Sequence, residues 1–198
     1  MAAFLAAADA ARDRLGGRSV VNVNSTAQGG GVAEMLHTLL AYARGAGIPT
    51  RWLVVEGDQP FFAITKRLHN SLYGSPGDGG DLGEAERRTY EAALAGNGGL
   101  FDAVRPGDVW FVHDPQPAGL IPALRRAGAL VVWRCHIGRD EPNDHTERGW
   151  AFLRPYIEVA DAFVLARGVR TAVARPRPPA GDPTVDRPVH AEERAAAA

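Results

Sequence analysis

Hydrophobic residues recur along the chain in two alternating patterns, as short continuous runs and as longer stretches with helical spacing. Short runs are typical of buried strands, and helical spacing is typical of helices that pack on a sheet. The runs predict strands at residues 19–23, 50–57, 108–114, 129–137 and 161–166. The spacing predicts helices at residues 32–43, 61–74, 83–96, 118–128 and 150–160, after an alanine-rich helix at residues 2–15.

This alternation predicts an α/β fold, a Rossmann-like parallel sheet with helices on both faces. The predicted organisation is an N-terminal helix at residues 1–18 and one Rossmann-like domain at residues 19–164. Residues 165–198 show no hydrophobic period and are rich in arginine and proline, so we expect a disordered tail there.

Composition narrows the class of protein. A length of 198 residues with 45% hydrophobic and 23% charged residues suits one globular domain. The net charge of −1 argues against nucleic acid or an anionic membrane as the main partner. Cys135 is the only cysteine, which excludes an internal disulfide and fits a reducing compartment. Because neither a signal peptide nor a run of about 20 apolar residues is present, we expect a soluble cytoplasmic protein.

Three consecutive glycines, Gly29 to Gly31, stand between the first predicted strand and the helix that follows. Free backbone N–H groups and the helix dipole favour an anion at such a junction, and the missing Cβ atoms permit close approach. A tight turn packed against its neighbour is the alternative interpretation, and the glycines alone leave both open. The dinucleotide fingerprint G-x-G-x-x-G is not matched, which disfavours an NAD-dependent oxidoreductase.

Polar side chains follow four of the predicted strands. Because ligands of doubly wound sheets bind beyond the carboxyl ends of the strands, such residues can line a sugar-sized polar pocket. Each residue alone has a simpler explanation; Asn24 can cap a turn, and His136 can be a satisfied core histidine. The set comprises Asn22, Asn24, Glu56, Asp58, His113, Asp114, Gln116, Arg134 and His136.

A series of segments resembles one enzyme family. The runs NVNSTAQGGGVAEMLHTLL, WLVVEGD, FFAITKRLHN, VHDPQPAGLIP, VVWRCHI and FLRPYIEVADAFV occur in this order between about Ser19 and Val164. They are similar to the N-terminal domain of retaining trehalose synthases of the glycosyltransferring type, in glycosyltransferase family 4. The resemblance implies the N-terminal, acceptor-side half of a two-domain GT-B enzyme.

The resemblance implies transfer of glucose from a nucleoside-diphosphate-glucose to free glucose, which forms trehalose, without a metal or another cofactor. A C-terminal domain would be the partner of this chain, and a homodimer is left open. We expect a chain of this length to be inactive alone. A fragment of a trehalose phosphorylase and a non-catalytic sugar- or nucleotide-binding Rossmann domain are the alternatives.

The resemblance also assigns roles to residues. Gly29, Gly30 and Gly31 would bind the donor phosphate, and His113 and Asp114 would be catalytic. One departure is Gly138, which follows the WRCHI run where an acidic residue is expected. The residues assigned to the acceptor or sugar are Asn24, Glu56, Gln116, Arg134, His136, Lys66 and Asn70.

The resemblance ends abruptly at Leu165. When the tail is reverse-translated with permitted codons and read one base later, it gives SREEYAPPWLDPARLRVIPPSIDPFTPKN. This text resembles the linker into the second domain of the family. We therefore expect residues 165–198 to be an out-of-frame tail, with a shortened fifth strand and apolar surface left exposed.

Overall fold

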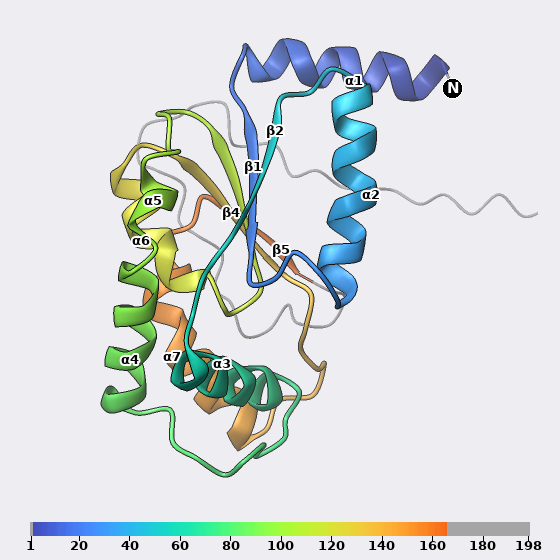
Figure 1. Cartoon of the computed structure of the whole chain (residues 1–198). Coiled ribbons are helices and arrows are strands. Elements are labelled where there is room, and N and C mark those ends of the chain that lie inside the picture. Colours follow the sequence, from blue (N-terminus) through green and yellow to red (C-terminus); the bar gives the residue numbers. More distant parts are fainter. Residues whose placement is uncertain (1, 166–198) are drawn as a thin grey trace, which may run out of the picture.

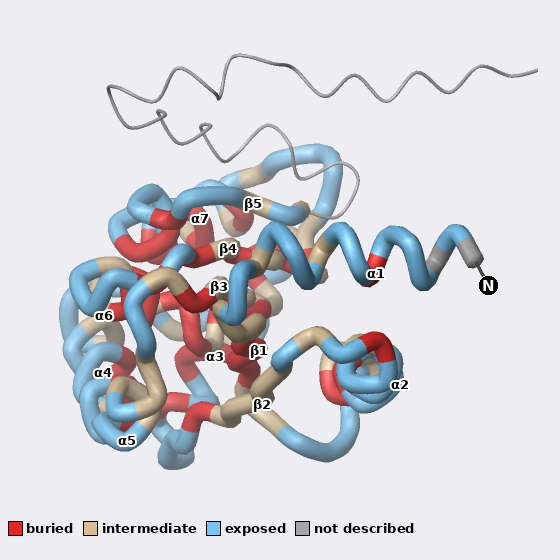
Figure 2. The backbone as a smooth tube through the Cα atoms, turned by 90° about the horizontal axis from the view of Figure 1, so that it is seen from above, coloured by how far each residue is buried: buried red, intermediate tan, exposed pale blue. Residues whose placement is uncertain are grey.

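A five-stranded parallel sheet forms the centre of the molecule. The computed structural model describes residues 2–165 (Figure 1). The strands pair in the order β2-β1-β3-β4-β5, which Figure 2 shows from above. The predicted α/β class with a parallel sheet is therefore confirmed. The strands are β1 (Val20–Asn24), β2 (Thr50–Val54), β3 (Val109–His113), β4 (Leu130–Cys135) and β5 (Ala162–Leu165).

Helices cover both faces of the sheet, as the sequence predicts (Figure 2). Helices α1 (Ala2–Leu15) and α2 (Gly31–Gly45) lie on one face. The opposite face carries α3 (Gln59–Leu72), α4 (Glu84–Ala95), α5 (Gly98–Phe101), α6 (Ile121–Arg126) and α7 (Asp144–Ile157). None of the helices within residues 2–165 has the length and apolar character that a membrane span requires.

Two helices differ in detail from the prediction. Helix α7 begins at Asp144, ahead of the predicted start at Trp150, and continues through Pro155. Its early start follows from the cap, because the Asn143 side chain accepts hydrogen bonds from the backbone N–H groups of His145 and Thr146. The predicted helix at residues 118–128 is a 3-10 turn (Ala118–Leu120) followed by the short α6.

The main hydrophobic core lies between the sheet and the helices α3, α4, α6 and α7. Alternate strand residues point into it, as the two-residue period of a strand requires. Trp133 of β4 is fully buried and meets Trp150 of α7 and Phe163 of β5 edge to face. The other fully buried strand side chains of this core are Val21, Val23, Trp110, Val112 and Val131.

The sheet face beside α1 and α2 is covered less completely. Leu130 of β4 is 37% exposed and Val164 of β5 is 42% exposed, and both strands lie toward one edge of the sheet. The sequence predicts exposed apolar surface, and on this face Leu130 and Val164 provide some. Leu165 ends β5, so it belongs to the sheet, whereas the rest of the predicted tail lies outside the described residues.

Candidate functional site

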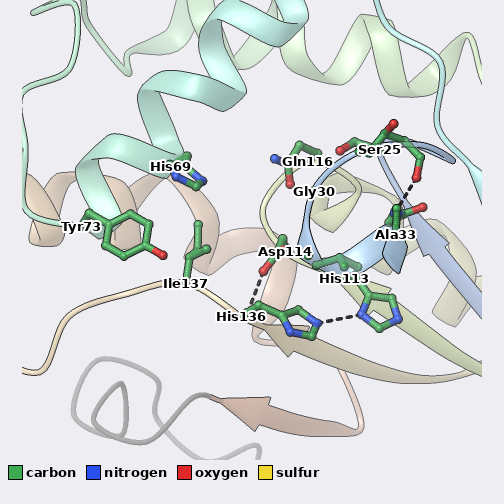
Figure 3. A pocket seen from close by; sticks show the side chains of 15 residues that line it. Ser25, Gly30, Ala33, His69, Tyr73, His113, Asp114, Gln116, His136 and Ile137 are labelled. Atoms are coloured by element: carbon green, nitrogen blue, oxygen red, sulfur yellow. Dashed lines mark hydrogen bonds between the residues drawn. The ribbon is translucent and has the colours of Figure 1, made fainter. Parts of the chain in front are cut away.

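A polar cleft of about 410 Å³ opens at the carboxyl ends of β1, β3 and β4 (Figure 3). After β1 the chain forms β2 on one side of that strand, and it then crosses back to form β3 on the other side. This reversal of strand order is the position where doubly wound sheets bind ligands. The lining residues are Asn24, Ser25, Thr26, Gly29, Gly30, Gly31, Val32, Ala33, His69, Tyr73, His113, Asp114, Gln116, His136 and Ile137.

The glycine loop forms one wall of the cleft. Gly29 and Gly30 have φ values of 72° and 82°, a region that side chains other than glycine rarely adopt. Gly30 precedes α2 and provides no side-chain cap, so the first N–H groups of the helix have no capping side chain. A Cβ atom placed on Gly29, Gly30 or Gly31 would meet nothing within 4 Å. The loop therefore offers backbone donors toward open space, which suits an anion.

Side chains at the end of β1 hold this loop. The Asn24 amide donates to the Thr26 carbonyl at 2.8 Å and its oxygen accepts from the Trp52 indole N–H at 2.8 Å. The Thr26 hydroxyl donates to the Gln28 carbonyl at 2.6 Å, and the Gln28 N–H donates back to that hydroxyl at 3.1 Å. The side-chain amide of Asn24 thus connects the loop to Trp52 of β2.

Two histidines form the floor of the cleft. Nδ1 of His113 lies 3.0 Å from Nε2 of His136, and Nε2 of His113 lies 2.9 Å from the amide oxygen of Asn22 (Figure 3 shows the contact between the rings). His113 is 1% exposed and Asn22 is 4% exposed. Both ring nitrogens of His113 are therefore engaged inside the protein, whereas His136 is only half-buried and lines the cleft.

Burial keeps both rings neutral. Desolvation, followed by the neighbouring His136 and Arg134, lowers the pKa of His113 to about 3. Desolvation and the Arg134 cation lower the pKa of His136 to about 4. At neutral pH each ring consequently carries one proton, and each can donate through one nitrogen and accept through the other.

Asp114 follows β3 in an unusual backbone conformation. Its φ is 64°, the only positive value among the described non-glycine residues, and its N–H donates to the Arg134 carbonyl at 2.8 Å. Its carboxylate accepts from the His136 backbone N–H at 2.6 Å. Desolvation raises the pKa of Asp114 to about 6, although the His136 N–H and Arg134 oppose that rise. Such strain and a shifted carboxyl pKa are common at functional sites.

The loop after Asp114 is fixed from the core side. The Tyr90 hydroxyl donates to the Pro115 carbonyl at 2.7 Å and accepts from the Gly119 N–H at 2.8 Å. The Trp133 indole donates to the Asp114 carbonyl at 3.1 Å. These bonds hold the VHDPQP segment rigidly, and its Gln116 faces the cleft.

The structure brings most of the predicted site residues together. The cleft is lined by Asn24, the three glycines, His113, Asp114, Gln116 and His136. Arg134 instead lies on the sheet face beside α2, where it lines a small apolar cavity with Asn22 and Phe111.

Glu56, Lys66 and Asn70 also lie outside the cleft lining. Glu56 is exposed after β2, and Asn97 binds its backbone N–H and carbonyl. Lys66 is exposed on α3, and Asn70 packs against Gly77. The sugar-binding role of these three residues and of Arg134 stays a prediction, and their positions do not favour it.

His69 of α3 and Tyr73, the residue that follows this helix, line the wall opposite the glycine loop and were missed in the sequence. Their ring centroids lie 5.0 Å apart, and Tyr73 is 48% exposed. Burial and the nearby Lys66 lower the pKa of His69. Their spacing of one helical turn was the available signal, because i and i+4 positions share a helix face.

No metal centre is formed by the described part of the chain, since it holds no group of three or more His, Cys, Asp or Glu side chains suitably placed for an ion. The polar groups of the cleft are backbone N–H groups, imidazoles, hydroxyl groups, a carboxyl group and two side-chain amides. Such groups recognise phosphate and hydroxyl oxygens.

Comparison with known proteins agrees with the geometry. The trehalose synthase of Pyrococcus horikoshii is 41% identical over 152 residues, which cover 77% of this chain and 35% of that protein. The trehalose synthase of Rubrobacter xylanophilus is 42% identical over 159 residues, 76% of this chain and 36% of that protein. A trehalose phosphorylase of Pleurotus pulmonarius is 32% identical over 154 residues, 71% of this chain and 21% of that protein. The chain thus spans about a third of the length of the trehalose synthases that it matches.

Among solved structures, the α,α-trehalose 6-phosphate synthase of Burkholderia multivorans matches with a TM-score of 0.44 and 17% identity, over 71% of this chain and 36% of that one. The sequence match is far more specific. A family model described as trehalose synthase, N-terminal domain, matches residues 22–169. The chain belongs to the family of trehalose synthase N-terminal domains.

Proposed function

We propose that this chain supplies the acceptor-side half of a GT-B active site that transfers glucose from a nucleoside-diphosphate-glucose to glucose and forms trehalose with retention. The observation that carries the proposal is the single cleft that joins the glycine loop to His136 and Asp114. In that cleft the diphosphate would lie against the first N–H groups of α2. The sugar hydroxyls would contact the polar groups at the ends of β3 and β4.

The retaining reaction needs no strong base from this chain. The acceptor hydroxyl attacks the face of the donor sugar from which the phosphate departs, so the C–O bond to phosphate breaks as the new C–O bond forms. The departing phosphate oxygen takes the hydroxyl proton. The protein then contributes position and electrostatic stabilisation, for which the rigid loop after Asp114 and the neutral imidazoles are suited.

The relatives favour one other reaction in the same cleft, because trehalose phosphorylases also match this chain. In that case inorganic phosphate would occupy the glycine loop in place of the donor diphosphate. A test for phosphate-dependent cleavage of trehalose separates this reaction from synthesis with a nucleotide donor.

A chimera tests the proposed function. Residues 1–164 are fused to the C-terminal remainder of the Rubrobacter xylanophilus relative, and trehalose is assayed with glucose and nucleotide-glucose donors. We expect trehalose from the chimera and none from the isolated chain, since a GT-B reaction takes place between two domains. A folded chimera that neither makes nor cleaves trehalose would contradict the proposal.

Calorimetry on the isolated chain separates the broader classes. Glucose or UDP-glucose binding supports a sugar-transfer cleft, whereas NAD binding would indicate an oxidoreductase. Binding of sugar by a chain whose chimera is inactive would favour a non-catalytic binding domain.

A further inference from the structure

Asn22 lies in the middle of β1, and unlike Asn24 at the end of that strand it does not bind the glycine loop. It is 4% exposed, and its amide oxygen contacts Nε2 of His113. A buried polar side chain in a central strand is costly unless it is satisfied by a specific hydrogen bond. Its position therefore needs an explanation beyond packing.

The direction of this hydrogen bond sets the direction of the next one. An amide oxygen can only accept, so Nε2 of His113 is the protonated nitrogen and Nδ1 is the acceptor. Nδ1 of His113 then accepts from Nε2 of His136 at 3.0 Å. The proton of the neutral His136 ring is thereby placed on Nε2, and its Nδ1 keeps a free lone pair.

That nitrogen is the one which remains for a ligand. No described residue forms a hydrogen bond with Nδ1 of His136, and the residue lines the cleft. The His136 backbone is fixed separately, because its N–H donates to the Asp114 carboxylate at 2.6 Å. The planes of the two rings are inclined by 22° with centroids 5.3 Å apart, so the rings meet edge to edge at the hydrogen-bonded nitrogens.

We propose that Asn22 is a positioning residue which, through His113, fixes the His136 proton on Nε2, so that Nδ1 of His136 accepts a hydrogen bond from a ligand hydroxyl in the cleft. The identification of that hydroxyl as a sugar hydroxyl rests on the proposed function. The low pKa values of His113 and His136 support the relay, since protonation of either ring would remove its acceptor nitrogen.

Nitrogen NMR of the histidine rings tests the relay directly on the whole chain, without any substrate. Long-range ¹H–¹⁵N spectra of the ¹⁵N-histidine-labelled chain report which nitrogen carries the proton. They are recorded at about pH 8, above the ordinary histidine pKa of about 6.5, so that neutral rings are compared. His113→Gln and His136→Gln spectra assign the signals. We expect both rings in the Nε2–H form, and a His136 ring in the Nδ1–H form would overturn the proposal.

Two substitutions at Asn22 separate positioning from packing. Asn22→Asp keeps an acceptor beside His113 and should preserve the Nε2–H form of His136. Asn22→Leu removes the acceptor and should shift His136 toward the Nδ1–H form. Thr50→Val is the matched control, because Thr50 lines the same small cavity as Asn22 and takes no part in the hydrogen bonds of the two histidines. An unchanged His136 tautomer in folded Asn22→Leu contradicts the proposal; if that variant does not fold, the wild-type and Asn22→Asp spectra decide it.

The chimera gives an independent readout. Asn22→Leu should lower kcat/KM for trehalose formation by about tenfold or more, as expected when a buried hydrogen bond is lost, and Asn22→Asp should restore most of it. Equal losses in both variants would count against the relay. If the wild-type chimera makes no trehalose, the proposed function fails, whereas the tautomer spectra still decide the role of Asn22.

Discussion

The two faces of the sheet are built for different purposes. On the face toward α3 and α7, every strand position in the central strands is apolar and fully buried, as with Trp110 and Trp133. On the face toward α1 and α2, the same strands carry Asn22, Asn24 and His113, and Leu130 is partly exposed. One face holds the fold together, and the other carries the polar groups that lead to the cleft.

The difference shows how a single strand can serve both purposes. Neighbouring residues of a strand point to opposite faces, so Val112 enters the core while His113 reaches the cleft floor. Substitutions on the core face should therefore act on stability, and substitutions at the cleft should act on catalysis. The predictions that follow test this division.

Replacing Trp133 should have the largest effect on stability. Trp133→Ala leaves a cavity beside Trp150 and Phe163 and should reduce the free energy of unfolding by ~3–5 kcal/mol. Val132→Ala, one residue away on the half-covered face, is the control and should cost less than half as much. Urea unfolding of both variants measures this, and equal losses would contradict the division between the faces.

Replacing Gly30 should have the largest effect on catalysis. In the chimera, Gly30→Val places a branched side chain where the phosphate is expected, and should lower turnover by ~100-fold or more. Gly79→Val is the matched control, because Gly79 also has a positive φ of 75° with no atom near its Cβ position, but lies outside the cleft. Both variants should lose similar stability, and normal activity of Gly30→Val would end the phosphate-loop interpretation.

The two histidines should respond differently to removal. His136→Ala in the chimera should lower kcat/KM by ~100-fold, since this half-buried ring faces the ligand. Its melting temperature should fall less than that of His113→Ala, because only Nδ1 of His113 loses its partner. His113→Ala should lower kcat/KM by a similar factor and also lower the melting temperature, because it leaves Asn22 buried without its partner. If His113→Ala lowers the melting temperature but leaves kcat/KM unchanged, His113 has a structural role in the core and no role in catalysis.

The smallest predicted effect is a change in stability with pH. Because the folded pKa values of His113 and His136 are about 3 and 4, the unfolded chain binds protons first as pH falls below about 6.5, and stability decreases. Asp114 opposes this, since its folded pKa of about 6 lets the folded state bind a proton first. Two histidines outweigh one carboxyl group, so urea unfolding should show lower stability at pH 4.5 than at pH 7. The loss should be smaller in His136→Gln.

Much of the fold could be predicted because local patterns determined it. Apolar runs and helical spacing located every strand and the longer helices, and the alternation of elements predicted the parallel sheet. The start of α7 was missed because it depends on an Asn143 cap rather than on apolar spacing. The strand order was not predicted, since it depends on long-range packing.

The site was predictable only where backbone position decides it. The ends of parallel strands meet at one edge, so His113, Asp114 and His136 could be placed together. The position of Arg134 could not be predicted in this way, because its side chain lies on the sheet face beside α2 and not at the edge. The link from Asn22 to His113 depends on the pairing of β1 with β3, which no single segment reveals.

The central claim is that the cleft at the ends of β1, β3 and β4 binds the substrates of glucosyl transfer. Backbone amide NMR of the ¹⁵N-labelled chain during addition of UDP-glucose and glucose tests it most directly. The account predicts shifts concentrated at Gly29 to Gly31, Asp114 and His136, with no response at α1 or α4. Shifts confined to residues outside the cleft, or none at saturating ligand, would contradict it.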